Sequence, residues 1–162
     1  MDTDYILKEL EKKLKGKIVI LGIGNPLRGD DAFGSLFADR IMGKVNLSIY
    51  NGGSSPENIL GKIIQEKPDT ILIVDAVDFG TNSGNMDLWE EVEDLRTLNI
   101  FFTHNLSLRM IFDFLKESTN SKIYLLAIQP KSIKFGDKIS PELEEKLNLL
   151  SEWFIEKYFV KK

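Results

Sequence analysis

The amino-acid sequence predicts an α/β fold: a single-domain three-layer sandwich in which a twisted, mostly parallel sheet of about five strands carries helices on both faces. The length of 162 residues suits one domain, which we place at residues 1–162. Three apolar, β-branched runs show no polar alternation, as is typical of strands buried on both faces: 17–23, 70–77 and 122–128. Amphipathic segments separate these runs and indicate helical crossovers between parallel strands.

The first half of the chain is predicted to alternate helices and strands. An amphipathic helix over 4–15 is expected to end at Gly16, and the apolar run 17–23 forms the first strand. Apolar residues at three- and four-residue steps then predict a helix over 31–43, closed by Gly43. The remaining elements of this half are a strand (45–50), a glycine- and serine-rich loop (51–58) and a short helix around 59–64.

The second half continues the same alternation. The run 70–77 is a fully apolar strand, and 86–92 alternates less cleanly, which favours an edge strand. An amphipathic helix over 105–118 leads to the last apolar strand, 122–128. From Ser140 onward, a serine N-cap, a proline at the first helical position and a one-sided apolar pattern predict a long helix.

The composition excludes several classes of protein. A net charge of −4 with scattered lysines offers no basic stripe, so we expect no nucleic acid as a partner. The absence of cysteine removes disulfides, thiolate zinc sites, iron–sulfur clusters and a cysteine nucleophile. No apolar run reaches the ~20 residues that cross a bilayer, and the first residues are charged, unlike a signal peptide. We therefore expect no membrane insertion and a cytoplasmic location.

Polar residues with catalytic potential fall where the predicted strands end. In a parallel sheet, ligands bind outside the carboxyl ends of the strands, because strand-to-helix turns and helix N-termini gather there. Three candidates occupy such places: the pair Asp30 and Asp31 after the first strand, Asp75 at the end of a later one, and His104 before a helix. We therefore expect these side chains to converge at one edge of the sheet.

The turn GIGNPLRGDDAFG favours a carboxylate site over a phosphate site. Gly22 and Gly24 match the start of a dinucleotide-binding fingerprint, but Leu27 stands where the third glycine belongs. Two aspartates also place negative charge at the helix N-terminus that would receive phosphate. We interpret Asp30 as the cap of the following helix and Asp31 as the carboxylate facing the sheet edge, with the reverse order as the alternative.

The other two candidates would complete a metal site. Asp75 interrupts an apolar strand, so its carboxylate needs a partner, either a functional ligand or a loop backbone. His104 is the only histidine and lies in a turn rather than on an apolar helical face. Two carboxylates and one imidazole suit nickel, iron or zinc and leave coordination positions open. Such a site without thiolate is expected to bind metal weakly, which fits a metal that arrives attached to a partner.

Four segments, in this order, are similar to motifs of the hydrogenase maturation endopeptidases: GIGNPLRGDDAFG, IVDAVDFG, THNLSL and AIQPKSIKFG. The resemblance extends from residue 17 to residue 158 and includes the family's twisted sheet between helices. One departure is Ala32, which stands where the family commonly has a glycine after the acid pair. The start of a helix tolerates alanine at this position.

The resemblance implies a hydrolase, an aspartyl-type peptidase that removes the C-terminal extension of a [NiFe] hydrogenase large-subunit precursor after nickel insertion. It further implies that Asp31, Asp75 and His104 bind metal, and that the nickel is carried by the precursor. Whether the metal polarises the scissile carbonyl or activates water, or an aspartate acts as general base, stays open.

Three alternatives remain at this point. A serine hydrolase would use Ser54 or Ser55 with an aspartate and the histidine, but the chain has no G-x-S-x-G elbow, and helix capping explains the serines better. A non-enzymatic, doubly wound nucleotide-binding domain would use the glycine turn. A plain interaction module would respond to neither nucleotide nor metal.

Overall fold

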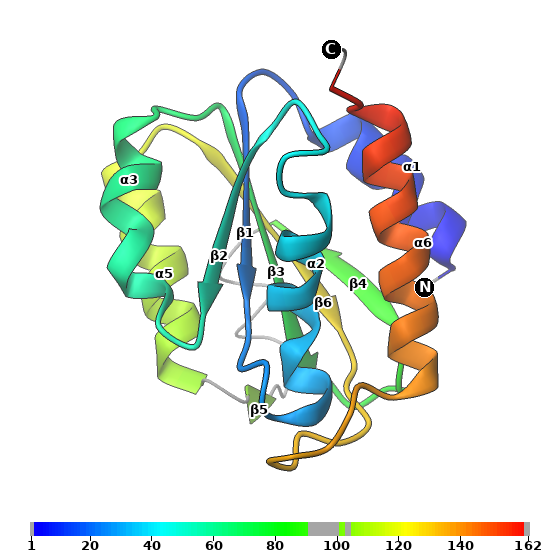
Figure 1. Cartoon of the computed structure of the whole chain (residues 1–162). Coiled ribbons are helices and arrows are strands. Elements are labelled where there is room, and N and C mark those ends of the chain that lie inside the picture. Colours follow the sequence, from blue (N-terminus) through cyan, green and yellow to red (C-terminus); the bar gives the residue numbers. More distant parts are fainter. Residues whose placement is uncertain (1, 91–100, 103–104, 161–162) are drawn as a thin grey trace.

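The computed structural model describes residues 2–90, 101–102 and 105–160, which form a sheet with helices on both faces (Figure 1). Its strands are β1 (Ile18–Ile23), β2 (Ser48–Gly53), β3 (Thr70–Asp78), β4 (Met86–Trp89), β5 (Phe101–Phe102) and β6 (Lys122–Ile128). The order across the sheet is β2-β1-β3-β6-β4, and β5 pairs with β3 outside this path.

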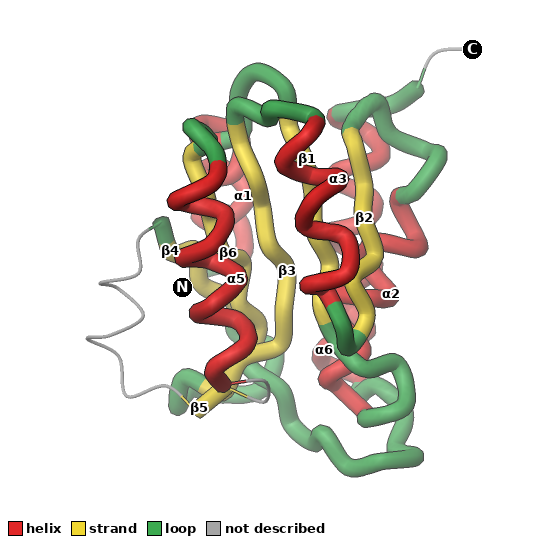
Figure 2. Tube along the Cα trace, turned by 90° about the vertical axis from the view of Figure 1, so that its left-hand side faces the viewer, coloured by secondary structure: helices red, strands yellow, loops and turns green. Residues whose placement is uncertain are grey.

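The helices divide into two layers. One face of the sheet is covered by α1 (Thr3–Lys13), α2 (Phe33–Ile41) and α6 (Pro141–Lys157). The other face is covered by α3 (Leu60–Gln65) and α5 (Asn105–Ser118), which lie in front of the sheet in Figure 2. Two 3-10 turns, η1 (Gly29–Ala32) and η2 (Pro56–Ile59), precede α2 and α3. None of the helices in the described ranges is both long and apolar enough to cross a membrane.

Parallel pairing brings the carboxyl ends of four strands to one edge of the sheet. β1 pairs in parallel with β2 and β3, and β3 pairs in parallel with β6, so these four strands share a carboxyl edge. Gly22 lies opposite Val74, and Asp75 lies opposite Ala127. β4 pairs antiparallel with β6 and ends the strand order, so it is an edge strand as predicted; residues 91–92 of the predicted strand lie outside the described residues.

The strand β3 is buried on both faces, which explains its continuous apolar sequence. Leu72 and Val74 pack into the core beneath α1, α2 and α6, whereas Ile73 and Val77 pack into the core beneath α3 and α5. Because side chains alternate along a strand, Asp75 belongs to the face covered by α3 and α5. The sequence pattern thus places a carboxylate in an otherwise apolar layer.

The predicted fold class is confirmed, with two local corrections. The predicted helix 31–43 is instead the 3-10 turn η1 followed by the shorter helix α2. The predicted loop 51–58 is wrong at its start, because β2 continues through Gly53, which pairs with Ile23 after a register shift that leaves Gly52 of β2 as the extra residue. Parallel pairing with β1 overrides the turn preference of this glycine-rich segment.

Candidate active site

The carboxyl edge of the sheet carries two of the predicted site residues. Asp31 lies in η1, the turn that follows β1, and Asp75 lies near the end of β3, the strand beside β1. The turn η1 contacts β3 directly. Figure 1 shows the beginning of α2 and the ends of β1 and β3 at this same lower edge. The predicted convergence of these two chain segments is therefore present.

Glycines allow this turn to lie against the two strands. A Cβ atom at Gly24, which has φ +153°, would collide with the carbonyl oxygen of Asp31. A Cβ atom at Gly34 would collide with the carbonyl oxygens of Ile23 in β1 and Val74 in β3. The first turn of α2 therefore rests on the backbone of both strands, next to Asp75. Gly24 serves the approach of the protein's own backbone, where a dinucleotide-binding turn would admit a phosphate.

Both aspartates are withdrawn from water. Asp31 and Asp75 are each only 1% exposed. The Oδ2 atom of Asp31 accepts a hydrogen bond from the backbone N–H of Asn25 at 3.1 Å, which fixes the carboxylate over the turn after β1. Burial places the two carboxylates in surroundings with a lower dielectric constant than water. Their attraction to a cation is therefore stronger than it would be in water.

The third predicted site residue, His104, lies outside the described residues. Its described neighbours belong to the same part of the fold: Phe102 pairs with Val77 at the end of β3, and Asn105 is the first residue of α5. Within the described ranges, no three His, Cys, Asp or Glu side chains form a group that could hold a metal ion. The role of His104 stays a prediction.

The structure corrects the predicted role of Asp30. Its side chain makes no capping hydrogen bond to α2, and neither η1 nor α2 has a side-chain cap. Instead the fully buried carboxylate accepts hydrogen bonds from the backbone N–H groups of Lys131, Ser132 and Ser140, at 2.7, 3.2 and 2.6 Å. It also accepts from the hydroxyl of Ser140 at 2.9 Å. Asp30 thus anchors the segment between β6 and α6. The N–H donors of that segment bind its carboxylate in place of the N–H donors at the start of α2.

The hydroxyls that were expected to cap helices do not do so. Ser140 occupies the N-cap position of α6 with Pro141 after it, as predicted, but its hydroxyl donates to Asp30 instead. Ser55 stands at the N-cap position of η2, also without a side-chain cap, and both Ser54 and Ser55 are exposed. The start of α3 is held by packing rather than by these serines.

Sequence reasoning missed Gln129, a buried polar residue directly after β6. Its Oε1 atom accepts from the backbone N–H of Phe79 at 2.8 Å, and its Nε2 atom donates to Asp78 at 3.0 Å. Its backbone also pairs with Gly84 and Asn85. Gln129 therefore fixes the loop that leaves β3. A polar residue ending an apolar run was the available signal, the same one that identified Asp75.

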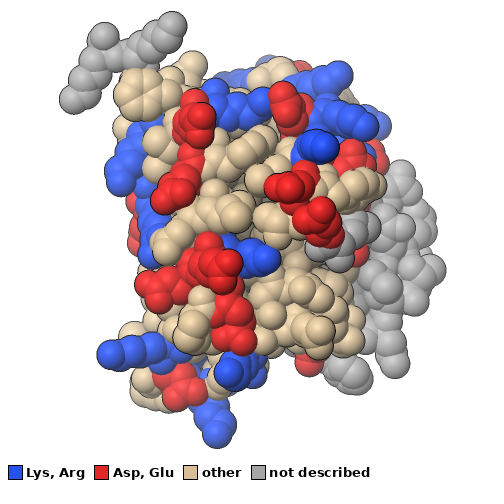
Figure 3. Space-filling model, turned by 90° about the vertical axis from the view of Figure 1, so that its right-hand side faces the viewer, with Lys and Arg blue, Asp and Glu red and all other residues tan. Residues whose placement is uncertain are grey.

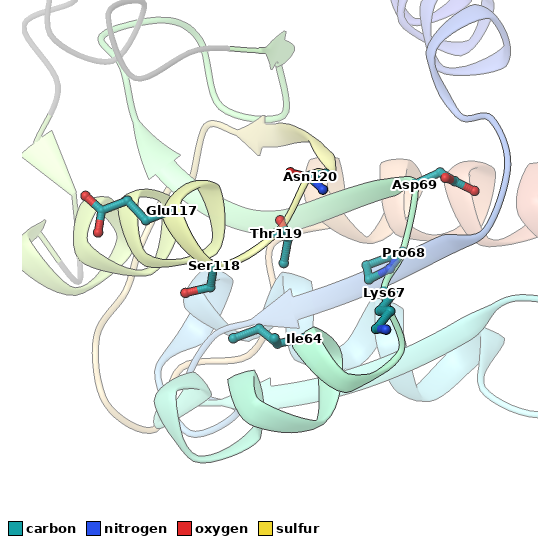
Figure 4. A pocket seen from close by; sticks show the side chains of 8 residues that line it. All are labelled: Ile64, Lys67, Pro68, Asp69, Glu117, Ser118, Thr119 and Asn120. Atoms are coloured by element: carbon teal, nitrogen blue, oxygen red, sulfur yellow. The ribbon is translucent and has the colours of Figure 1, made fainter.

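Two cavities of the described chain lie away from the two aspartates. One of about 550 Å³ opens at the opposite edge, between the C-terminal ends of α3 and α5 (Figure 4). Asp69 lines it, but its carboxylate accepts a hydrogen bond from the backbone N–H of Lys17 at 2.7 Å, which is a structural role. A second cavity of about 360 Å³ lies between η2, α3 and α5 and is mostly apolar.

Comparison with known proteins identifies the family. Residues 32–157 match the family model described as hydrogenase maturation protease. The Hydrogenase 3 maturation protease of Escherichia coli K12 is 37% identical over 119 residues, covering 72% of this chain and 75% of that protein.

Solved structures agree with this match. The [NiFe] hydrogenase maturation protease HycI from Thermococcus kodakarensis KOD1 superimposes with a TM-score of 0.80 at 39% identity, covering 91% of this chain and 97% of that one. The endopeptidase HycI from Escherichia coli gives a TM-score of 0.75 at 30% identity, covering 87% and 90%. These findings confirm the predicted enzyme class over the nucleotide-binding alternative. The chain therefore belongs to the hydrogenase maturation protease family and is an endopeptidase of hydrogenase maturation.

Proposed function

We propose that this peptidase removes the C-terminal extension of a [NiFe] hydrogenase large-subunit precursor after nickel insertion. We further propose that it recognises the nickel carried by that precursor through Asp31, Asp75 and His104. The observation that supports this most is the pair of aspartates, each 1% exposed, at the carboxyl ends of adjacent parallel strands. The Thermococcus kodakarensis relative, a [NiFe] hydrogenase maturation protease, supports the substrate class.

The chemistry of the donors fits a nickel-bearing substrate. Carboxylate oxygens and an imidazole nitrogen are ligands that nickel accepts, and a set of three leaves room for ligands from the precursor. Because Asp31 and Asp75 are buried in the sheet edge, the protein rather than the substrate determines where the metal comes to lie. Only a precursor that already contains nickel then presents its scissile peptide at a fixed position.

Hydrolysis requires proton transfer as well as positioning. A water molecule attacks the scissile carbonyl, and a carboxylate of the aspartate pair accepts its proton as general base. The leaving amine takes up a proton as the peptide bond breaks.

Processing of matched precursors tests the nickel requirement. Purified enzyme is incubated with nickel-loaded and nickel-free large-subunit precursor, and the release of the C-terminal extension is followed by mass spectrometry. We expect cleavage of the loaded form alone. Equal processing of both forms would overturn recognition of nickel, and release of no peptide from either would overturn the assignment of substrate.

Site variants test the residues. Asp31→Asn, Asp75→Asn and His104→Ala are each expected to lower the rate by at least about 10²-fold, the usual contribution of an acid–base group. Asp78→Asn is the matched control, because Asp78 ends the same strand but is exposed. Unchanged thermal unfolding shows that each variant is folded. Full activity of the Asp75→Asn variant would exclude that carboxylate from the site.

A further inference from the structure

A protruding pair of loops lies beside the candidate active site. It consists of residues 27–28 and 131–138 and is called here the basic prong. The backbone N–H of Gly136 donates to the carbonyl oxygen of Leu27 at 2.8 Å. The Nε atom of Arg28 donates to the carbonyl oxygen of Ile133 at 3.2 Å. These bonds join the turn after β1 to the segment after β6, and Figure 1 shows that segment at the lower edge of the molecule.

The basic prong is fixed in position by buried groups. Asp30, the residue before the candidate ligand Asp31, binds both ends of segment 131–140 through its carboxylate. Its backbone N–H also donates to the carbonyl oxygen of Ser132 at 2.8 Å. Gly29 permits this approach, since a Cβ atom there would lie 2.5 Å from that same oxygen. The prong is therefore held at a set position relative to Asp31.

The surface of the basic prong is predominantly positive. It carries four basic side chains, Arg28, Lys131, Lys134 and Lys138, and the single acid Asp137, in a chain whose net charge is −4. In Figure 3, red side chains occupy the middle of the face formed by α1 and α6, and blue ones gather at its lower end and at its upper end.

The same surface exposes large apolar side chains. Leu27 is 60% exposed and Phe135 is 75% exposed. The value for Phe135 is the highest among the exposed large apolar residues of the described chain. Lysine stems next to an exposed aromatic ring form a surface suited to an acidic partner with its own apolar residue. Because hydrogen bonds already hold the loops, docking costs little conformational entropy.

We propose that the basic prong docks an acidic segment with an apolar side chain on the hydrogenase precursor, and so guides the scissile peptide to Asp31 and Asp75. This inference rests on the proposed function. The prong residues are placed to bind the substrate away from the reacting bond, so their loss affects KM and the association rate rather than kcat. Attraction between exposed charges is screened by salt, so docking weakens as ionic strength rises.

Charge reversal on the prong tests the proposal. The variant Lys134→Glu/Lys138→Glu is compared with Lys44→Glu/Lys62→Glu, which makes the same change at exposed positions outside the prong. For the prong variant we expect KM for nickel-loaded precursor to rise about tenfold, with kcat within about twofold and the salt dependence of kcat/KM reduced. The control is expected to match wild type. Equal KM values for the two variants would overturn the proposal.

The apolar part is tested in the same way. Phe135→Ser is expected to raise KM severalfold, whereas Phe159→Ser, at an aromatic residue that is 64% exposed elsewhere, is expected to leave it unchanged. A melting temperature equal to that of the wild type shows that each of these surface variants is folded.

A binding measurement separates failure of docking from failure of the proposed function. Association of precursor with the cleavage-deficient Asp75→Asn protein is measured by biolayer interferometry, with and without the prong substitutions. Loss of binding on charge reversal supports docking even if nickel-free precursor proves to be cleaved. Binding that the prong substitutions leave unchanged overturns it.

Discussion

Replacing Asp30 with asparagine tests whether this residue anchors the segment between β6 and α6. The carboxylate is fully buried. Its Oδ1 atom accepts from the N–H of Ser140 at 2.6 Å, while Oδ2 accepts from two backbone N–H groups and the Ser140 hydroxyl. Asparagine keeps the shape but replaces one acceptor oxygen with an NH₂ donor. In the more favourable of its two orientations, the amide oxygen takes the place of Oδ2 and keeps its three hydrogen bonds. The NH₂ group then takes the place of Oδ1 and faces the backbone N–H of Ser140, which loses its acceptor.

The expected cost follows from these contacts. Leaving one buried donor unsatisfied costs about 1–3 kcal/mol, and the three remaining bonds lose their charge-assisted character, which makes such bonds roughly twice as strong as neutral ones. We expect Asp30→Asn to lower the free energy of unfolding by about 3 kcal/mol. For a domain of this size that corresponds to a fall in Tm of about 6–12 °C.

Urea and thermal unfolding at neutral pH measure this change, with the exposed Glu152→Gln as an acid-to-amide control. A double-mutant cycle with Ser140→Ala adds a specific test, because residues in one hydrogen-bond network couple by about 0.5–3 kcal/mol. If Asp30 instead capped α2, the effects of Asp30→Asn and Ser140→Ala on the free energy of unfolding would simply add. Asp30→Asn within about 0.5 kcal/mol of wild type, or a coupling energy of zero, refutes the anchoring role.

Two further variants test packing and charge. Gly34→Ala is expected to lower the free energy of unfolding by about 1–3 kcal/mol, because its Cβ atom meets the carbonyl oxygen of Val74; this cost outweighs the gain of about 1 kcal/mol in helix propensity. Gly61→Ala, whose Cβ atom would meet open space, is expected to raise the free energy of unfolding in the same urea assay. Burial raises the pKa of Glu66, but two hydroxyl donors and a nearby lysine outweigh it, so the pKa lies below its ordinary 4.5. A lowered pKa stabilises the fold at pH values above 4.5. The stability difference between wild type and Glu66→Gln should therefore shrink as pH falls from about 4.5 through the lowered pKa; a difference that stays constant over this range contradicts this.

The sequence was sufficient for the strands because burial on both faces is a local property. β3 has apolar residues on both sides, interrupted only by Asp75, so its pattern carries both the strand and the candidate ligand. The segment Asn51–Gly53 was mispredicted because its extended conformation depends on pairing with β1. Asn51 also holds it locally, accepting from the N–H of Gly53 and donating to Asp39. Local glycine content gives no sign of that pairing.

The residues of the candidate site were predictable only where a local sequence pattern marks them. Asp31 and Asp75 stand at the ends of apolar runs, and the structure brings their strands together. The function of Asp30 was not predictable, since its partners lie 101 to 110 positions later in the sequence. No local pattern of charge or hydrophobicity relates residues so far apart. The role of His104 stays a prediction from the sequence and the family resemblance.

The position of β6 in the sheet determines when during synthesis the enzyme is complete. β6 is the last strand to leave the ribosome, yet it lies between β3 and β4, and β4 pairs with no other described strand. A nascent chain that stops before β6 leaves one side of β3 open and lacks the partners of Asp30. Because a domain folds as a unit, the candidate active-site edge is complete only after β6 and the segment that binds Asp30 have emerged. Translation order thus delays the completion of this edge until most of the chain has been made.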